Sequence, residues 1–404
     1  MTPVRRYITI SAADELCSQI LSVAIAWHVY SATHNPMSLA YVGLTQFFPN
    51  IAMALFAGQA ADRFDRRKIT GLSLLVQALC ATALAGLSVP RAQSVGPIYV
   101  LLTLIGLARA FSEPALSSML PQQVSAREFP RAVAAASSAH QICSIAGPAL
   151  GGLPYTLSAP GLFAFVASLY LVASLAVHRL NAGTQTSRSS DGSILAGVSY
   201  IRRNRLLLAL TSLDLFAVLL GGVTALLPIY AKDILAIGPA GLGCLRCAPG
   251  VGAAIIGLVL AKRGLENGAG KLMLASVAGF GLAAIIFAIS TNFWISLIAL
   301  VSLGGFDMVS MVIRGTLVQM STPEAMRGRV SAVNGAFISA SSELGQFESG
   351  ATAALFGVVP AALLGGVGTL AIVALWTWIF PELHSCPLKL APEPNHPKPA
   401  AMSL

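Results

Sequence analysis

Charged residues are scarce in this chain: only 10% of its 404 residues are Asp, Glu, Lys or Arg, whereas 55% are hydrophobic. Soluble domains carry about 25% charged residues. A soluble core cannot absorb this much apolar sequence, so lipid must be the solvent for most of the chain. The scarcity of charge therefore excludes an ordinary soluble globular protein and predicts an integral membrane protein.

Motifs for energy-consuming or catalytic chemistry are also missing. The sequence has no G-x-x-x-x-G-K-[ST] loop and no HExxH, and no nucleophile has a base nearby. A membrane-embedded enzyme therefore ranks last among the functions considered, and ATP hydrolysis within this chain is not expected. Cys244 and Cys247 form a Cys-x-x-Cys pair without a second pair or a His cluster. We predict no enzymatic activity, no cofactor and no metal site.

Long apolar runs are what the sequence has instead. A membrane-spanning helix needs about 20 apolar residues. The sequence contains twelve such runs, at 7–30, 38–60, 69–89, 97–119, 132–153, 159–178, 206–230, 240–261, 272–289, 293–314, 331–355 and 361–380. They predict an all-α integral membrane protein with twelve transmembrane helices.

The net charge of +9 could indicate a nucleic-acid partner, but the distribution of the charges does not. Lys and Arg gather at the termini and in alternate loops, whereas the other loops hold only Arg91 and Lys232. Cytoplasmic loops of membrane proteins carry this excess. We therefore expect a multi-pass protein of the cell (inner) membrane with both termini in the cytoplasm, membrane lipid as a partner and no nucleic acid.

The sequence repeats itself weakly. An offset of 200 residues aligns Asp14 with Asp214, Tyr30 with Tyr230 and Pro49 with Pro249, and an offset of 198 aligns Arg131 with Arg329. Two six-helix halves with the same orientation are typical of transporters that bind substrate between their halves. We predict halves at 1–180 and 206–381, joined by a cytoplasmic linker at 181–205. The remaining residues, 382–404, are Pro-rich and predicted to be disordered.

The linker combines two kinds of sequence. Residues 181–193 are rich in Ser, Thr and Gly, which is typical of a flexible segment. Residues 194–201 are mostly apolar and lead into Arg202, Arg203 and Arg205. This pattern predicts a short amphipathic helix on the anionic inner leaflet.

One loop is unusually polar. Gly58, Asp62, Arg63, Arg66 and Arg67 form the pattern G-x-x-x-D-R-x-x-R-R. It resembles the signature loop between helices 2 and 3 of the major facilitator superfamily, and the resemblance implies a gating role on the cytoplasmic side. The corresponding loop of the second half, 262–271, lacks the Asp-Arg pair. We expect the first-half loop to carry more of the gating.

Two further stretches resemble exporters of that superfamily. Gly147, Pro148, Gly151 and Gly152 match the helix 5 element G-P-x-x-G-G, which the family has in antiporters and largely lacks in uptake members. Ordinary packing of small residues is the alternative. Residues 327–334 and 342–350 resemble the enterobactin-exporter-like branch, which contains both siderophore and multidrug exporters.

Acidic residues inside the predicted spans are the candidates for coupling and binding: Asp14, Glu15, Glu113, Asp214, Asp307, Glu343 and Glu348. A carboxylate at membrane depth costs several kcal/mol unless it is paired, hydrated or protonated. Burial favours the protonated form, so a proton gradient can load and unload such groups. Structural ion pairs and helix ends in the headgroup region are the alternative explanations.

Arg109 is the basic residue near the middle of helix 4, and Glu113 lies on the same face of that helix. The arginine resembles that of the R-x-x-Q-G motif, which implies a role in proton coupling; a local Arg109–Glu113 pair is the alternative. Under the 198-residue offset Arg109 corresponds to Asp307, so we expect these two side chains to approach from opposite halves.

The sequence thus predicts a secondary active transporter that works by alternating access. The expected activity is proton-coupled efflux of a small amphipathic molecule, a drug or a siderophore. An uptake symporter of the same fold and a non-transporting membrane receptor or scaffold remain as alternatives.

Overall fold

A computed structural model describes residues 2–89, 95–125, 127–181, 194–263 and 268–385. Regular structure in these ranges is helical throughout, with no strand. The prediction of an all-α membrane protein is therefore confirmed. Most of the predicted flexible linker and nearly all of the predicted disordered tail lie outside the described residues.

The elements follow one another with short connections. The first half contains α1 (Pro3–Thr33), α2 (Pro36–Arg63), α3 (Arg66–Leu87), α4 (Gly96–Ser117), η1 (Leu120–Gln123), α5 (Phe129–Tyr155) and α6 (Ala159–Val177). After α7 (Ile194–Arg203), the second half contains α8 (Arg205–Leu220), η2 (Val223–Leu226), α9 (Leu227–Ile229), η3 (Tyr230–Ile234), α10 (Gly238–Arg263), α11 (Ala269–Ile289), α12 (Phe293–Met320), α13 (Glu324–Phe356), α14 (Val358–Ile379) and η4 (Pro381–Ser385).

Polar side chains fix where several helices begin. Asn35 Oδ1 accepts a hydrogen bond from the Met37 backbone N–H at 3.0 Å and starts α2. Asn204 and Asn292 cap α8 and α12 in the same way. An Asn at the N-cap satisfies a backbone donor that has no partner in the helix. These caps set the point at which each helix begins.

Nine helical segments in the described ranges are long and apolar enough to cross a membrane, and Arg205–Ile234 counts as one of them. The long helices α2, α5 and α13 are not in this group. With these three included, the described residues form twelve long helical segments, as predicted. All three pack across the boundary between the two halves.

The seventh of these segments is not straight. It breaks after α8 at Gly221 and Gly222, where a Cβ on Gly222 would lie 2.5 Å from the carbonyl oxygen of Gly345. Close approach of α13 therefore requires glycine at this position. The segment then ends in a π-helical turn at Tyr230–Ile234, which carries Lys232 and Asp233.

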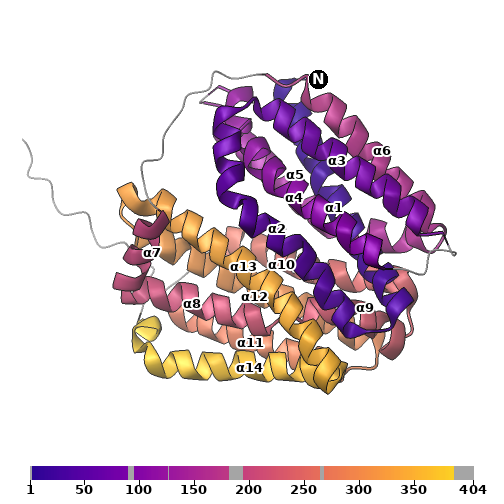
Figure 1. Cartoon of the computed structure of the whole chain (residues 1–404). Coiled ribbons are helices and arrows are strands. Elements are labelled where there is room, and N and C mark those ends of the chain that lie inside the picture. Colours follow the sequence, from indigo (N-terminus) through magenta and orange to yellow (C-terminus); the bar gives the residue numbers. More distant parts are fainter. Residues whose placement is uncertain (1, 90–94, 126, 182–193, 264–267, 386–404) are drawn as a thin grey trace, which may run out of the picture.

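Figure 1 shows two helical bundles that converge where α9 lies and spread apart toward α7. We call the end where the bundles converge the α9 end. We call the opposite end, which holds α7 and the loop after Arg63, the basic end. One apolar core lies wholly in the first half, on α1, α3, α4 and α6. A second core mixes Val23, Ala26 and Tyr30 of α1 with residues of the second half. The halves are thus joined at the α9 end.

Two helix pairs make most of the contact between the halves: α5 packs on α10, and α2 packs on α13. In the helix 5 element, Gly147 faces α1, whereas Gly152 faces α10. A Cβ on Gly152 would clash with the carbonyl oxygen of Pro239, and a Cβ on Gly243 would lie 2.7 Å from that of Pro148. The two backbones meet with no side chain between them at this point.

This contact makes Gly152 a sensitive test of the packing between the two halves. Gly152→Ala should lower the free energy of unfolding by about 1–3 kcal/mol, because overpacking at a backbone contact forces the helices apart. Thermal unfolding of the purified protein in detergent measures this. Gly335→Ala is the matched control, since Gly335 lies within α13 and a Cβ there would meet nothing within 4 Å. Equal unfolding temperatures for the two variants would contradict the contact.

Candidate functional site

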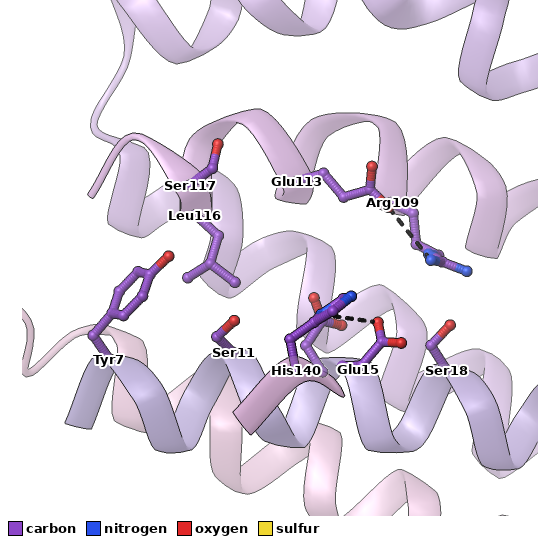
Figure 2. Close-up of a pocket in the computed structure, with 10 residues that line it drawn as sticks. Tyr7, Ser11, Glu15, Ser18, Arg109, Glu113, Leu116, Ser117 and His140 are labelled. Carbon is purple, nitrogen blue, oxygen red and sulfur yellow. Dashed lines mark hydrogen bonds and ion pairs between the residues drawn. The ribbon is translucent and has the colours of Figure 1, made fainter. Parts of the chain in front are cut away.

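A pocket of about 250 Å³ lies in the first half between α1, α4 and α5. Figure 2 shows its side chains pointing toward one another across the space between α1 and α4. Residues four apart share a face of a helix, which is why α1 presents several of them together. The pocket is lined by Tyr7, Ser11, Asp14, Glu15, Ser18, Arg109, Glu113, Leu116, Ser117 and His140.

Charged groups of both signs meet in this pocket. Arg109 and Glu113 form an ion pair along α4, with Nη2 and Oε1 3.3 Å apart. Glu15 accepts a hydrogen bond from Gln19 at 2.9 Å, and His140 Nδ1 lies 3.6 Å from its other oxygen. Asp14 makes no hydrogen bond or ion pair within the described ranges, although the charge of Arg109 acts on it. Its carboxylate is therefore the least compensated in the pocket.

The electrostatic group continues into the second half. Glu343 of α13 is within electrostatic range of Arg109 from the first half and of Arg246 from α10. Gln346 donates a hydrogen bond to Glu343 at 3.4 Å, and the Arg246 guanidinium donates one to the Ser22 hydroxyl of α1. Arg109 and Glu343, which come from opposite halves, thus share one electrostatic environment.

Asp307 lies elsewhere. It lines a pocket of about 270 Å³ in the second half, and Arg109 is not among the residues that line this pocket. The expected approach of Arg109 to Asp307 is therefore not what the structure shows. The charge of Arg109 acts on Glu343 instead.

Asp214 and Glu348 have structural partners. Asp214 of α8 forms a buried ion pair with Arg314 of α12. Glu348 accepts a hydrogen bond from Thr352 of its own helix at 2.8 Å. Arg314 was not among the residues predicted from the sequence, because the predicted tenth span ended at residue 314. In the structure α12 continues to Met320, so this arginine lies inside the helix and only 5% of its surface is exposed.

The basic loop makes its described contacts within the first half. Arg66 donates to the carbonyl oxygen of Ser118 at 3.2 Å, and Arg67 donates to that of Leu180 at 3.4 Å. Asp65 caps α3 and pairs with Arg67 at 2.9 Å. The hydrogen bond from Arg67 holds the pKa of the Asp65 carboxyl below its usual range. Arg63 is exposed, a Cβ on Gly58 would meet nothing within 4 Å, and the Asp62 side chain lies outside what the structure describes.

The α9 end carries polar contacts between the halves. The Tyr30 hydroxyl of α1 donates to the Asp233 carboxylate of η3. Lys232 donates to the carbonyl oxygen of Ser31 at 3.2 Å and lies 3.3 Å from His34 Nε2. We call these three contacts the latch. They lie beside the glycine contact of α5 and α10, so this end of the molecule is closed, whereas Ser137, Ser138 and His140 are exposed toward the basic end of α5.

The described residues contain no group of three or more His, Cys, Asp and Glu side chains that could hold a metal ion. The charged residues of the pockets instead form pairs of opposite sign or stand alone. Such an arrangement can exchange protons or bind a charged group on a ligand.

Comparison with known proteins agrees with this architecture. The family described as transmembrane secretion effector matches residues 3–401. Among curated proteins, the enterobactin exporters EntS of Escherichia coli O1:K1 and of Escherichia coli O45:K1 are each 27% identical over 380 residues, which cover 90% of this chain and 88% of the relative.

Solved transporter structures share the fold. The nucleoside transporter NupG superposes with a TM-score of 0.70 at 13% identity and covers 94% of this chain and 99% of its own. A POT family transporter in complex with 5-aminolevulinic acid gives 0.74 at 10% identity, covering 94% of this chain and 96% of its own. Identities this low support the fold alone.

The buried Asp214–Arg314 pair generates a stability prediction. Arg314→Met should lower the free energy of unfolding by about 3–5 kcal/mol, because it leaves the Asp214 carboxylate buried without a partner. Asp214→Asn together with Arg314→Met should recover most of that loss. Thermal unfolding of the purified variants in detergent measures both, and a double variant no more stable than Arg314→Met alone would contradict the pairing.

Proposed function

Because the chain belongs to the transmembrane secretion effector family of the major facilitator superfamily, we propose that it exports a small amphipathic molecule from the cytoplasm in exchange for protons. Transport across a membrane, rather than catalysis, follows from the family. The observation that carries the proposal is the charge group of Arg109, Arg246 and Glu343, which joins the two halves through the hydrogen bond from Arg246 to Ser22. A charge group that spans the two halves changes whenever the halves move.

In this proposal the chain lies in the inner membrane, and its basic end faces the cytoplasm. Exposed Arg and Lys residues gather there, including Arg5, Arg63, Lys68, Arg203 and Arg327. The α9 end holds Lys232, which is engaged in the latch. An excess of positive residues is characteristic of the cytoplasmic side. One side of the basic helix α7 packs on α13, where Gly197 lies against the backbone of Arg329. Arg202 and Arg203 of α7 are exposed.

The described conformation corresponds to one state of an alternating-access cycle. The halves are joined at the α9 end by the latch and by the glycine contact of Gly152 with α10. Toward the basic end α5 is exposed, so the first-half pocket is open to the cytoplasm. Rocking of the halves about the pockets would break the latch and bring the basic ends together. The loop containing Asp62 and Arg63 would then meet the second half.

Asp14 and Glu343 are the carboxylates best placed to carry the proton. Both are within electrostatic range of Arg109, and they belong to opposite halves. When Arg109 lies close, the charged carboxylate is favoured; when the halves move it away, the buried acid takes up a proton. Export then requires that a proton arriving from outside weakens the binding of substrate, since the two affinities are linked.

Export rather than uptake is supported by two observations. The helix 5 element Gly147–Gly152 is the exporter pattern, and it forms the contact that closes the α9 end. The curated relatives that match over most of the chain are named as exporters. An uptake symporter would accumulate substrate on the opposite side, so transport in vesicles of known orientation separates the two directions.

The orientation can be tested with single cysteines in a variant that lacks the six native ones. A cysteine at Lys68 should resist an impermeant thiol reagent added outside intact cells, because the basic end faces the cytoplasm. A cysteine at Ala32, which is exposed at the α9 end, should react and serves as the control. Labelling at residue 68 in intact cells would overturn the orientation.

The coupling residues can be tested in everted membrane vesicles with a panel of fluorescent dyes and siderophores. Asp14→Asn and Glu343→Gln should each abolish uphill transport driven by a proton gradient, because the carrier can no longer release a proton, yet leave downhill exchange partly intact. Glu324→Gln, an exposed acid on the first turn of α13, is the matched control and should transport normally.

The same vesicles also give the result that would contradict this assignment. If both neutral variants build a substrate gradient that collapses when an uncoupler is added, the proton is carried elsewhere and the assignment to Asp14 and Glu343 is wrong.

A further inference from the structure

Asp307 stands apart from the charge group around Arg109. It is the one charged side chain among the residues that line the second-half pocket of about 270 Å³. The other lining residues are small, apolar or neutral: Val218, Gly221, Gly222, Thr224, Pro249, Gly250, Ala253, Phe280, Leu303, Gly304, Ser342 and Gln346. The cavity therefore presents a single negative charge on an otherwise uncharged wall.

The Asp307 carboxylate has no basic partner within the described ranges, where it makes neither a hydrogen bond nor an ion pair. Arg314 lies two helical turns further along α12, but Asp214 already binds its guanidinium. Arg246 of α10 donates its hydrogen bond to Ser22 of α1. A carboxylate at membrane depth is costly unless a positive charge, water or a proton compensates it. A ligand with a positive charge would supply that compensation.

The shape of the pocket favours a flat ligand. Gly221, Gly222, Gly250 and Gly304 line it without projecting side chains. The Phe280 ring packs against the first of these, since a Cβ on Gly221 would lie 2.7 Å from a ring carbon. Phe280 and Asp307 also line a smaller cavity of about 20 Å³ that reaches Asp214. An aromatic face beside a carboxylate attracts a cation through both groups.

We propose that this second-half pocket binds a compact aromatic or amphipathic cation, with Asp307 as its counter-ion and Phe280 as the wall against which its ring lies. Ser342 and Gln346 supply hydrogen-bonding groups to its lining. A ligand whose recognised group is an anion, such as a carboxylate or a catecholate, is repelled by the same charge. This inference rests on the proposed function and names the substrate class of the transporter.

Direct binding to the purified full-length chain in detergent tests the proposal. The probes are 9-aminoacridine, a planar cation at neutral pH, and acridine-9-carboxylate, which carries an anion on the same ring system. Fluorescence titration should show at least about tenfold tighter binding of the cation, and Asp307→Asn should remove that preference. Glu324→Gln should bind like the wild type.

Two further variants test the cation site without replacing Asp307, in case Asp307→Asn unfolds. Ser342→Lys leaves Asp307 in place but adds a positive charge to the wall, and it should weaken the binding of 9-aminoacridine by about tenfold. Glu128→Gln removes an exposed carboxylate of the first half and should leave the binding unchanged. The proposal is overturned if the wild type prefers the anion, if Ser342→Lys binds the cation normally, or if Glu128→Gln abolishes binding.

The binding measurement is independent of transport. If vesicle experiments show no proton-driven export while 9-aminoacridine still binds through Asp307, the proposed function fails and the cation site stands. If export is confirmed while the wild type does not bind the cation, the site fails and the proposed function stands.

Discussion

The architecture depends on one close approach of two backbones. Gly152 of α5 and Gly243 of α10 bring the two halves together with no side chain between the helices. This contact fixes the α9 end, and the latch, which includes the hydrogen bond from Tyr30 to Asp233, lies beside it. Because the halves are held together at this end, their helices diverge toward the other, and α5 remains exposed there.

The same arrangement of the helices decides which charged side chains have partners. Asp214, which is buried within the second half, is paired with Arg314. Asp14 and Asp307 line pockets and have no ion-pair partner in the described ranges. Lipid does not tolerate unpaired charge, but a water-filled space between moving halves does. We therefore propose that the incomplete pairing marks the residues whose environment changes in transport, with a proton-carrying group around Arg109 and a separate cation-binding group around Asp307.

Much of the fold was predictable from the sequence, because spans, caps and charge asymmetry are local properties. The break in the seventh span was not predicted, since Gly221 and Gly222 matter through their contact with α13, which is distant in sequence. The partners of the charged residues also could not be predicted from the sequence. The charge of Arg109 acts on Glu343 rather than on Asp307, and this depends on the packing of helices that are distant in sequence. The burial of Arg314 was not predicted, because it is the continuation of α12 to Met320 that places this residue inside the bundle.

Pulsed electron resonance between spin labels tests the account most directly. One pair of labels would be placed at Arg63 and Arg327, on opposite halves at the basic end, and a second pair at Ala32 and Ala236, exposed at the α9 end. On acidification in lipid vesicles the basic-end distance should shorten while the α9-end distance lengthens, because protonation of the carboxylates favours the opposite state of the cycle. Distances that stay fixed, or that change in the same direction at both ends, would contradict an alternating opening of the two halves.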